Sequence, residues 1–161
     1  MIEILENFFI GSQLDYENNV KFQLNWYVIQ ACKEPYHREA LGYSGRAASN
    51  THPEYLIARR ENRLILNLVD VNDHRYFSSE ILDTALDEID KNINEKRILV
   101  HCNQGCSRSP MIGLLYMVRK RKLPCSSFIE AETEFSKIYP PYNPAKGIRD
   151  FAMMNWSKYS N

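Results

Sequence analysis

The chain has no long hydrophobic run and no excess of charge of either sign. Its longest apolar run, residues 111–118, is interrupted by a glycine and is far shorter than the roughly 20 residues that span a bilayer. Lysine plus arginine equals aspartate plus glutamate, at 20 each, so any preference for anions must be local. We therefore expect no membrane-spanning segment and no nucleic-acid partner.

Cysteine is also scarce. The four cysteines, Cys32, Cys102, Cys106 and Cys125, do not form the disulfide framework of a small secreted protein. The first residues lack the basic start and small-residue cleavage site of a signal peptide. These absences predict a reducing, cytoplasmic location. Internal repeats and linkers are missing too, so we expect one domain over residues 1–161, acting as a monomer.

Apolar, β-branched and aromatic runs predict buried strands. The runs lie at residues 2–5, 7–10, 26–29, 63–69 and 98–100. Helices are predicted after Ser78 or Ser79, from Met111, after a Ser127–Glu130 capping box, and from Pro144 with Asn143 as its cap. A strand–helix–strand unit over residues 63–100 requires parallel strands. The sequence thus predicts an α/β fold, a mostly parallel central sheet of about five strands with helices on both sides.

The segment from residue 31 to residue 60 is the least regular, because prolines and glycines interrupt it. Short helices are predicted at residues 36–41 and 53–60. Long irregular segments in compact domains often carry function. We interpret this one as a loop excursion that forms part of the rim of an active site.

The most informative stretch is residues 100–110, Val-His-Cys-Asn-Gln-Gly-Cys-Ser-Arg-Ser-Pro. An apolar strand precedes it and an amphipathic helix follows, so loop amides and a helix N-terminus should surround one anion-binding volume. Cys102 ends the strand, where this field favours the thiolate, and Arg108 offers a planar fork for two phosphate oxygens. The stretch predicts a phosphate cradle over a nucleophile. Its lining would come from Asn103, Gln104, Gly105, Cys106, Ser107 and Arg108.

The same residues carry a family resemblance. The pattern His101, Cys102, Gly105, Ser107, Arg108, Ser109 and Pro110 resembles the signature loop of the protein tyrosine phosphatases, in their dual-specificity branch. Residues 7–15 also resemble the N-terminal hairpin and first helix of that branch. The resemblance implies the cysteine-phosphatase type of α/β fold. It further implies a phosphoprotein substrate, hydrolysed at phosphotyrosine, with phosphoserine and phosphothreonine as further candidates, through a cysteinyl phosphate.

Individual roles follow from the chemistry and from the resemblance. Cys102 would attack phosphorus, Arg108 would hold the equatorial oxygens, and Gly105 would allow a tight turn. The resemblance gives Ser109 the role of helping the cysteine leave, and His101 an orienting role within the loop. The plainer interpretations are a buried structural cysteine and a surface arginine. An arginine in the first turn of a helix opposes the dipole unless an anion lies between them.

A leaving oxygen needs a proton, and the family takes it from an aspartate some thirty residues before the cysteine. Asp70 and Asp73 both fit. Asp73 is preferred, since Asp73 with His74 resembles the family's acid loop better, and Asp70 is kept as a supporting residue. The aspartate that is not the acid is expected to be a solvated turn or cap residue.

Cys106 departs from the residues common at its position in the loop. It is either an exposed small side chain on the rim, the preferred interpretation, or a partner for a reversible disulfide with Cys102. Neither a metal nor another cofactor is expected. Two other functions stay open: a phosphatase for phosphoinositides, inositol phosphates or RNA 5′ ends, and an inactive phospho-binding module. The neutral Asn103, Gln104 and Cys106 argue against polyanionic substrates.

Overall fold

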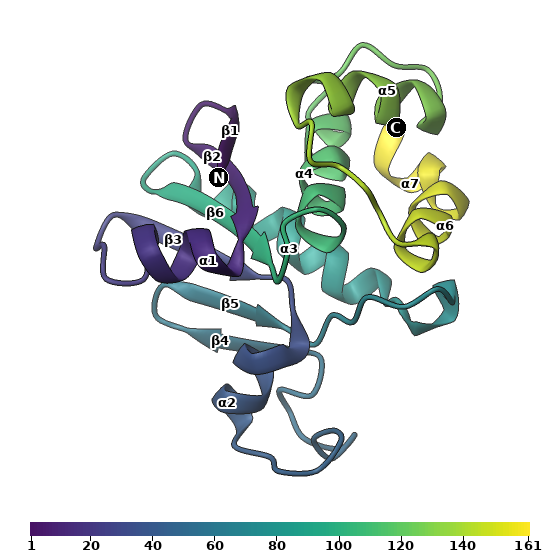
Figure 1. Cartoon of the computed structure of the whole chain (residues 1–161). Helices are drawn as coiled ribbons and strands as arrows, with labels where there is room; N and C mark the ends of the chain where they lie inside the picture. Colours follow the sequence, from purple (N-terminus) through teal and green to yellow (C-terminus); the bar gives the residue numbers. More distant parts are fainter.

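The computed structural model covers Met1–Asn161 and contains one six-stranded sheet (Figure 1). The strands are β1 (Ile2–Leu5), β2 (Phe8–Ser12), β3 (Trp26–Gln30), β4 (Ile57–Arg60), β5 (Arg63–Leu66) and β6 (Arg97–Cys102). Their order is β1-β2-β6-β3-β5-β4. The four central strands are parallel, and the two edge strands pair antiparallel with their neighbours. The mostly parallel sheet is confirmed, with six strands instead of about five.

The additional strand is β4, where the sequence predicted a helix over residues 53–60. That prediction is wrong, because Ile57–Arg60 pairs with Arg63–Leu66 across a turn at residues 61–62. Alanine and arginine favour helix locally, and the pairing with β5 overrides that weak preference. The helix predicted at residues 36–41 is present in part. It is a π-helical turn, η2 (Lys33–His37), followed by α2 (Arg38–Leu41).

The larger helices gather on one side of the sheet (Figure 1). They are α3 (Ser79–Asn92), α4 (Arg108–Arg119), α5 (Phe128–Ile138), α6 (Lys146–Met154) and α7 (Trp156–Ser160). The other side carries α1 (Gln13–Asp15) and the π-helical turn η1 (Tyr16–Val20), whose Tyr16 stacks on His101 of β6. The predicted helices on both sides are therefore confirmed. None of the helices is long and apolar enough to cross a membrane.

Helix α4 is the central element of the helical layer. Every residue from Arg108 to Val118 is buried, because the helix packs against β2 and β6 on one side and against α3, α5, α6 and α7 around the other. A Cβ on Gly113 would lie 2.9 Å from Cδ1 of Ile10, so glycine allows α4 to approach β2 closely. Strand β6 is buried from Ile98 to Cys102. The loop between β6 and α4 is thus held by two rigid, buried elements.

The predicted helix starts have mixed outcomes. Ser127 is the N-cap of α5 and accepts from the amide of Glu130 at 3.2 Å, as predicted, although the Glu130 carboxylate bonds to Ser126 instead of completing the box. The predicted start at Asn143 and Pro144 is wrong, since α6 begins at Lys146. The Asn143 amide donates to the carbonyl of Cys106, and the Ala145 amide donates to Ser107 Oγ. These bonds keep residues 143–145 extended against the loop.

Candidate active site

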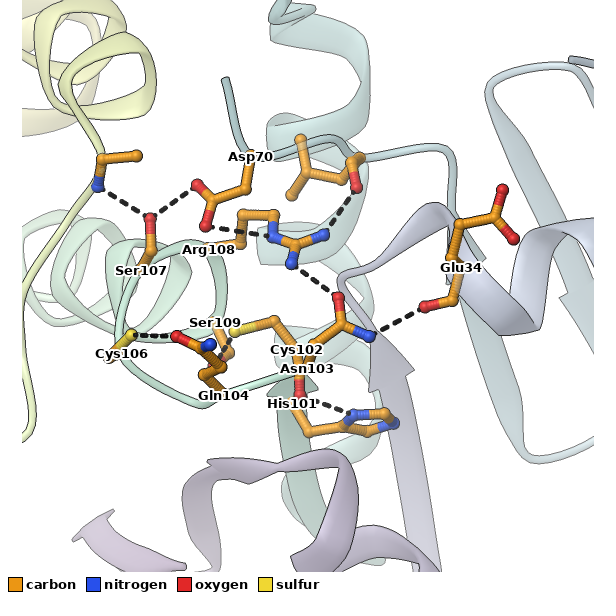
Figure 2. A network of polar contacts seen from close by, with 12 residues as sticks. Glu34, Asp70, His101, Cys102, Asn103, Gln104, Cys106, Ser107, Arg108 and Ser109 are labelled. Atoms are coloured by element: carbon orange, nitrogen blue, oxygen red, sulfur yellow. Dashed lines mark hydrogen bonds and ion pairs between the residues drawn. The ribbon is translucent and has the colours of Figure 1, made fainter. Parts of the chain in front are cut away.

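The loop between β6 and α4 forms one wall of a hollow of about 250 Å³. The hollow is lined by Asp70, Cys102, Asn103, Gln104, Cys106, Ser107 and Arg108. All but Asp70 come from the stretch that the sequence singled out. Figure 2 shows these side chains converging from the end of β6, the start of α4 and the segment after β5. The hollow thus lies at the carboxyl ends of parallel strands, where open α/β sheets bind ligands.

The loop turns its carbonyl groups outward. The Asn103 carbonyl accepts from the Gln13 amide at 3.2 Å, the Gly105 carbonyl from the Tyr139 hydroxyl at 2.6 Å, and the Cys106 carbonyl from the Asn143 amide at 2.7 Å. In a trans peptide unit the N–H points opposite to the C=O, so the next amide in each case faces the hollow. None of the amides of residues 103–107 donates to a protein acceptor. The loop is therefore a concave set of free amide donors, a typical anion site.

Gly105 makes this curvature possible. Its φ is +74°, in the left-handed region, and a Cβ there would lie 2.8 Å from the carbonyl oxygen of Gly11. Both the backbone conformation and the close approach to β2 exclude a larger residue without strain.

Cys102 lies at the floor of the hollow and is almost fully buried. The hydroxyl of Ser109, in the first turn of α4, lies 3.2 Å from Cys102 Sγ and 3.2 Å from the Gly11 carbonyl oxygen. A hydroxyl at this distance can donate to a thiolate and spread its charge. Ser109 is thus in contact with the sulfur, at the position where the sequence placed it.

Arg108 is nine-tenths buried, and its guanidinium is fixed from two sides. Nη1 donates to the Leu68 carbonyl at 3.0 Å, and Nη2 donates to Asn103 Oδ1 at 2.7 Å. Nε forms no hydrogen bond and lies 3.8 Å from a carboxylate oxygen of Asp70. A buried cation with an unused donor at the edge of a hollow is suited to bind an anion.

The structure brings Asp70, and not Asp73, to the hollow. Asp70 Oδ1 accepts from the Ser107 hydroxyl at 2.8 Å (Figure 2). Asp73 instead caps the 3₁₀ turn η3 (His74–Tyr76) and accepts from both the amide and the guanidinium of Arg75. The side-chain hydrogen bonds from Arg75 hold the pKa of the Asp73 carboxyl well below its usual value. The hollow is thus lined by Asp70 and not by the preferred Asp73, which a neighbouring arginine binds, and which of the two donates the proton stays a prediction.

No family model matches this chain. A Dictyostelium discoideum protein named "Probable dual specificity protein phosphatase" is 38% identical over 72 residues, which make up 41% of this chain and 31% of the relative. The chain therefore spans under a third of that relative's length.

Solved structures match over nearly the whole chain. The human tyrosine phosphatase-like serine/threonine/tyrosine-interacting protein has a TM-score of 0.67 at 17% identity, covering 99% of this chain and 97% of that one. Human DUSP28 has a TM-score of 0.62 at 14% identity, covering 99% and 91%. A leucine rich repeat and phosphatase domain containing protein of Entamoeba histolytica has a TM-score of 0.66 at 18% identity, covering 98% and 90%. The fold is that of the dual-specificity phosphatases.

Within this phosphatase fold, His101 lies behind the loop. Successive side chains of a strand alternate between faces, so the imidazole lies on the opposite face of β6 from the Cys102 thiol. It stacks on Tyr16, with ring centroids 4.9 Å apart, and meets the edge of Tyr36 at 5.2 Å. Burial lowers the pKa of His101 to about 4, so the ring is neutral at pH 7. His101 is thus a packing residue that fixes the end of β6.

Cys106 lies at the rim of the hollow, as the preferred interpretation has it, but it is half-buried and not exposed. Its thiol donates weakly to Gln104 Oε1 at 3.6 Å, and all four cysteines are free thiols. Burial raises the pKa of Cys106, which makes it a poorer nucleophile at neutral pH. A reversible disulfide with Cys102 stays a prediction.

Sequence reasoning missed several supporting residues. Asn103 was expected only to line the cradle, yet its side chain makes three hydrogen bonds. Its Oδ1 accepts from Arg108, and its Nδ2 donates to Gln13 Oε1 and to the Glu34 carbonyl. Tyr139, which holds the Gly105 carbonyl, lies far along the chain and gave no local signal. The excursion of residues 31–60 lines no part of the hollow and touches the loop through the Glu34 carbonyl. The expectation that it forms part of the rim is therefore not confirmed.

Proposed function

We propose that this chain is a cysteine-dependent phosphatase that hydrolyses phosphomonoesters through a cysteinyl-phosphate intermediate. One observation carries the proposal. A buried thiol, a fixed guanidinium with a free Nε, and a concave run of unpaired amides surround a single hollow, with the Asp70 carboxyl at its edge. A tetrahedral oxyanion matches all of these groups at once.

The first step transfers the phosphoryl group to the protein. The Cys102 thiolate attacks phosphorus in line, the bond from phosphorus to the ester oxygen breaks, and Asp70 gives its proton to the departing oxygen. Negative charge spreads over the three equatorial oxygens in the transition state. The loop amides and Arg108 are already oriented toward that charge, so little reorganisation is needed.

The second step regenerates the thiolate. Asp70, now a carboxylate, takes a proton from water as the water oxygen attacks phosphorus and the phosphorus–sulfur bond breaks. Inorganic phosphate leaves, and the sulfur departs as a thiolate. The Ser109 hydroxyl, 3.2 Å from Sγ, stabilises that thiolate by donating a hydrogen bond to it.

We propose phosphoproteins as the substrates, at phosphotyrosine and also at phosphoserine and phosphothreonine. The name of the Dictyostelium relative supports this choice. The neutral rim of Asn103, Gln104 and Cys106 supports it as well, because inositol polyphosphates would be better bound by basic side chains. We further propose that the protein acts as a monomer in the cytoplasm, where reducing conditions keep Cys102 a thiol.

A non-protein phosphomonoester is the second candidate. PTPMT1 shares the fold, with a TM-score of 0.62 at 13% identity, and was solved in complex with PI(5)P. A panel that sets phosphotyrosine and phosphothreonine peptides against phosphoinositides and inositol phosphates separates the two. Higher kcat/KM for the peptides is expected, and higher kcat/KM for the lipids would favour the second candidate.

The mechanism is tested by changing the nucleophile. Cys102→Ser should abolish turnover of p-nitrophenyl phosphate, because an alcohol in this site is a far weaker nucleophile than a thiolate. Cys125→Ser is the matched control, since Cys125 lies outside the hollow and should leave turnover unchanged. Turnover by Cys102→Ser, or phosphopeptide binding by the intact chain with no turnover, would contradict the proposal.

A further inference from the structure

A second and larger hollow lies at the other end of the sheet from Cys102. Its volume is about 560 Å³, within the range of ligand-binding clefts. Two turns enclose it, residues 21–25 before β3 and residues 61–62 between β4 and β5, and Figure 1 shows both at the left-hand end of the sheet. We call it the distal groove. Strand β3 runs from Trp26 in the groove to Gln30 beside His101, and Tyr16 of the groove stacks on His101 behind the catalytic loop.

The floor of the distal groove is apolar and rigid. Buried Tyr16, Val20, Trp26 and Val28 line it. Beside this floor, Phe22 and Leu24 on the 21–25 turn are 85% and 92% exposed, the highest values of any large hydrophobic side chain in the chain. Single exposed apolar residues are ordinary, but two on one turn next to an apolar hollow indicate an interaction surface.

The rim of the groove is basic. Lys21, Arg60 and Arg63 line it, and Glu61 is its one acidic residue. Lys21 and Arg60 are paired with carboxylates, whereas neither Arg63 nor the neighbouring Arg97, stacked over the Trp26 ring at 4.3 Å, forms an ion pair. Glu61 forms no ion pair either, so two unpaired cations stand against one unpaired carboxylate and leave a local excess of positive charge. The charge therefore favours an anionic occupant.

We propose that the distal groove docks an acidic peptide segment of a partner protein that carries bulky apolar side chains. The apolar side chains would cover Phe22, Leu24 and the floor, and the carboxylates would pair with Arg63 and Arg97. A bilayer would meet only the tips of Phe22 and Leu24 and leave the floor uncovered, so a peptide fits better. The inference is independent of the chemistry proposed at Cys102.

The test is a selection from a phage-displayed library of random peptides about 12 residues long, with the full chain as bait. Enriched peptides should combine aspartate or glutamate with leucine, isoleucine or phenylalanine. Their affinity, measured by fluorescence anisotropy, should fall about tenfold on Arg63→Glu and at least as far on Phe22→Ser with Leu24→Ser. Ile129→Ser is the matched control, because Ile129 is exposed on α5 away from the groove.

The substituted side chains are exposed or lie at the rim, so thermal unfolding and p-nitrophenyl phosphate turnover should match the wild type. Enrichment of peptides without acidic residues, or peptides that bind all variants equally, would overturn the proposal. Two further outcomes would also overturn it. One is binding of anionic phosphatidylserine vesicles but of no peptide, and the other is a dimer by analytical ultracentrifugation that Phe22→Ser with Leu24→Ser abolishes.

Discussion

The Ser107 hydroxyl donates to Asp70 Oδ1 at 2.8 Å and accepts from the Ala145 amide at 2.9 Å. One side chain therefore connects the segment that carries the proposed acid, the loop that binds the anion, and the start of α6. This connection places a carboxyl above the hollow without any contact to Cys102. It also keeps Asp70 at the hollow, whereas Asp73 bonds to Arg75 instead.

The first prediction separates the two aspartates. Asp70→Asn should lower kcat about 100- to 1,000-fold for phosphotyrosine peptides, because the phenolate then leaves without a proton. The loss should be smaller for p-nitrophenyl phosphate, whose leaving group needs little protonation. Asp73→Asn is the control and should keep kcat within about threefold, since it removes only the ion pair with Arg75 at the surface. Steady-state kinetics on both substrates decide between the two aspartates. A larger loss of kcat in Asp73→Asn than in Asp70→Asn would identify Asp73 as the acid.

The positions of Asp70 and Asp73 show what local sequence can predict. The strand, loop and helix around Cys102 and Arg108 follow from a contiguous pattern, and the structure places both residues as predicted. The position of Asp70 at the hollow depends on the Ser107 hydroxyl, which is distant in sequence, and spacing along the chain does not contain that information. The late start of α6 was missed for the same reason. Strand β4 was missed although its partner β5 is close in sequence, because its residues favour helix locally.

The second prediction concerns Asn103, whose Oδ1 accepts from Arg108 Nη2 at 2.7 Å. Asn103→Ala should lower kcat/KM about 10- to 100-fold, the value of one hydrogen bond to a buried charged group, because the guanidinium loses its fixed orientation. The inhibition constant of inorganic phosphate should rise in parallel, and this readout does not depend on turnover. Asn155→Ala, in the helical layer, is the control. A phosphate affinity equal to that of the wild type would show that Leu68 alone orients Arg108.

The third prediction uses two glycines with the same φ of +74°. A Cβ at Gly42 would meet nothing within 4 Å, whereas at Gly105 it would lie 2.8 Å from the Gly11 carbonyl. Gly42→Ala should therefore cost only the left-handed strain of about 1 to 2 kcal/mol. Gly105→Ala should add a backbone clash, lower the free energy of unfolding by a further 1 to 3 kcal/mol or so, and abolish turnover. Urea unfolding of both variants measures the difference, and equal losses would mean that the loop can move away from β2.

The fourth prediction concerns the pH dependence of stability. Burial lowers the pKa of His101 to about 4 from an unfolded value of 6.5, so the folded state excludes a proton that the unfolded state binds. The contribution of neutral His101 to the free energy of unfolding is therefore complete above pH 6.5. It is lost as the pH falls toward 4, by about 1.4 kcal/mol per pH unit. His101→Phe keeps an aromatic ring for stacking on Tyr16 and removes the titration. The free energy of unfolding, measured in urea at pH 7, 6 and 5, should then change less steeply with pH, by the amount that the linkage of about one proton contributes.

The exposed His52 provides the control for that experiment. His52→Asn replaces an exposed histidine and leaves the packing of His101 against Tyr16 and Tyr36 intact. His37 is also buried, and burial lowers its pKa as well, so the slope in His101→Phe should decrease without vanishing. A slope that stays at the wild-type value in His101→Phe would mean that the protonated ring is accommodated between Tyr16 and Tyr36. In that case His101 could not be the neutral packing residue that fixes the strand beneath the nucleophile.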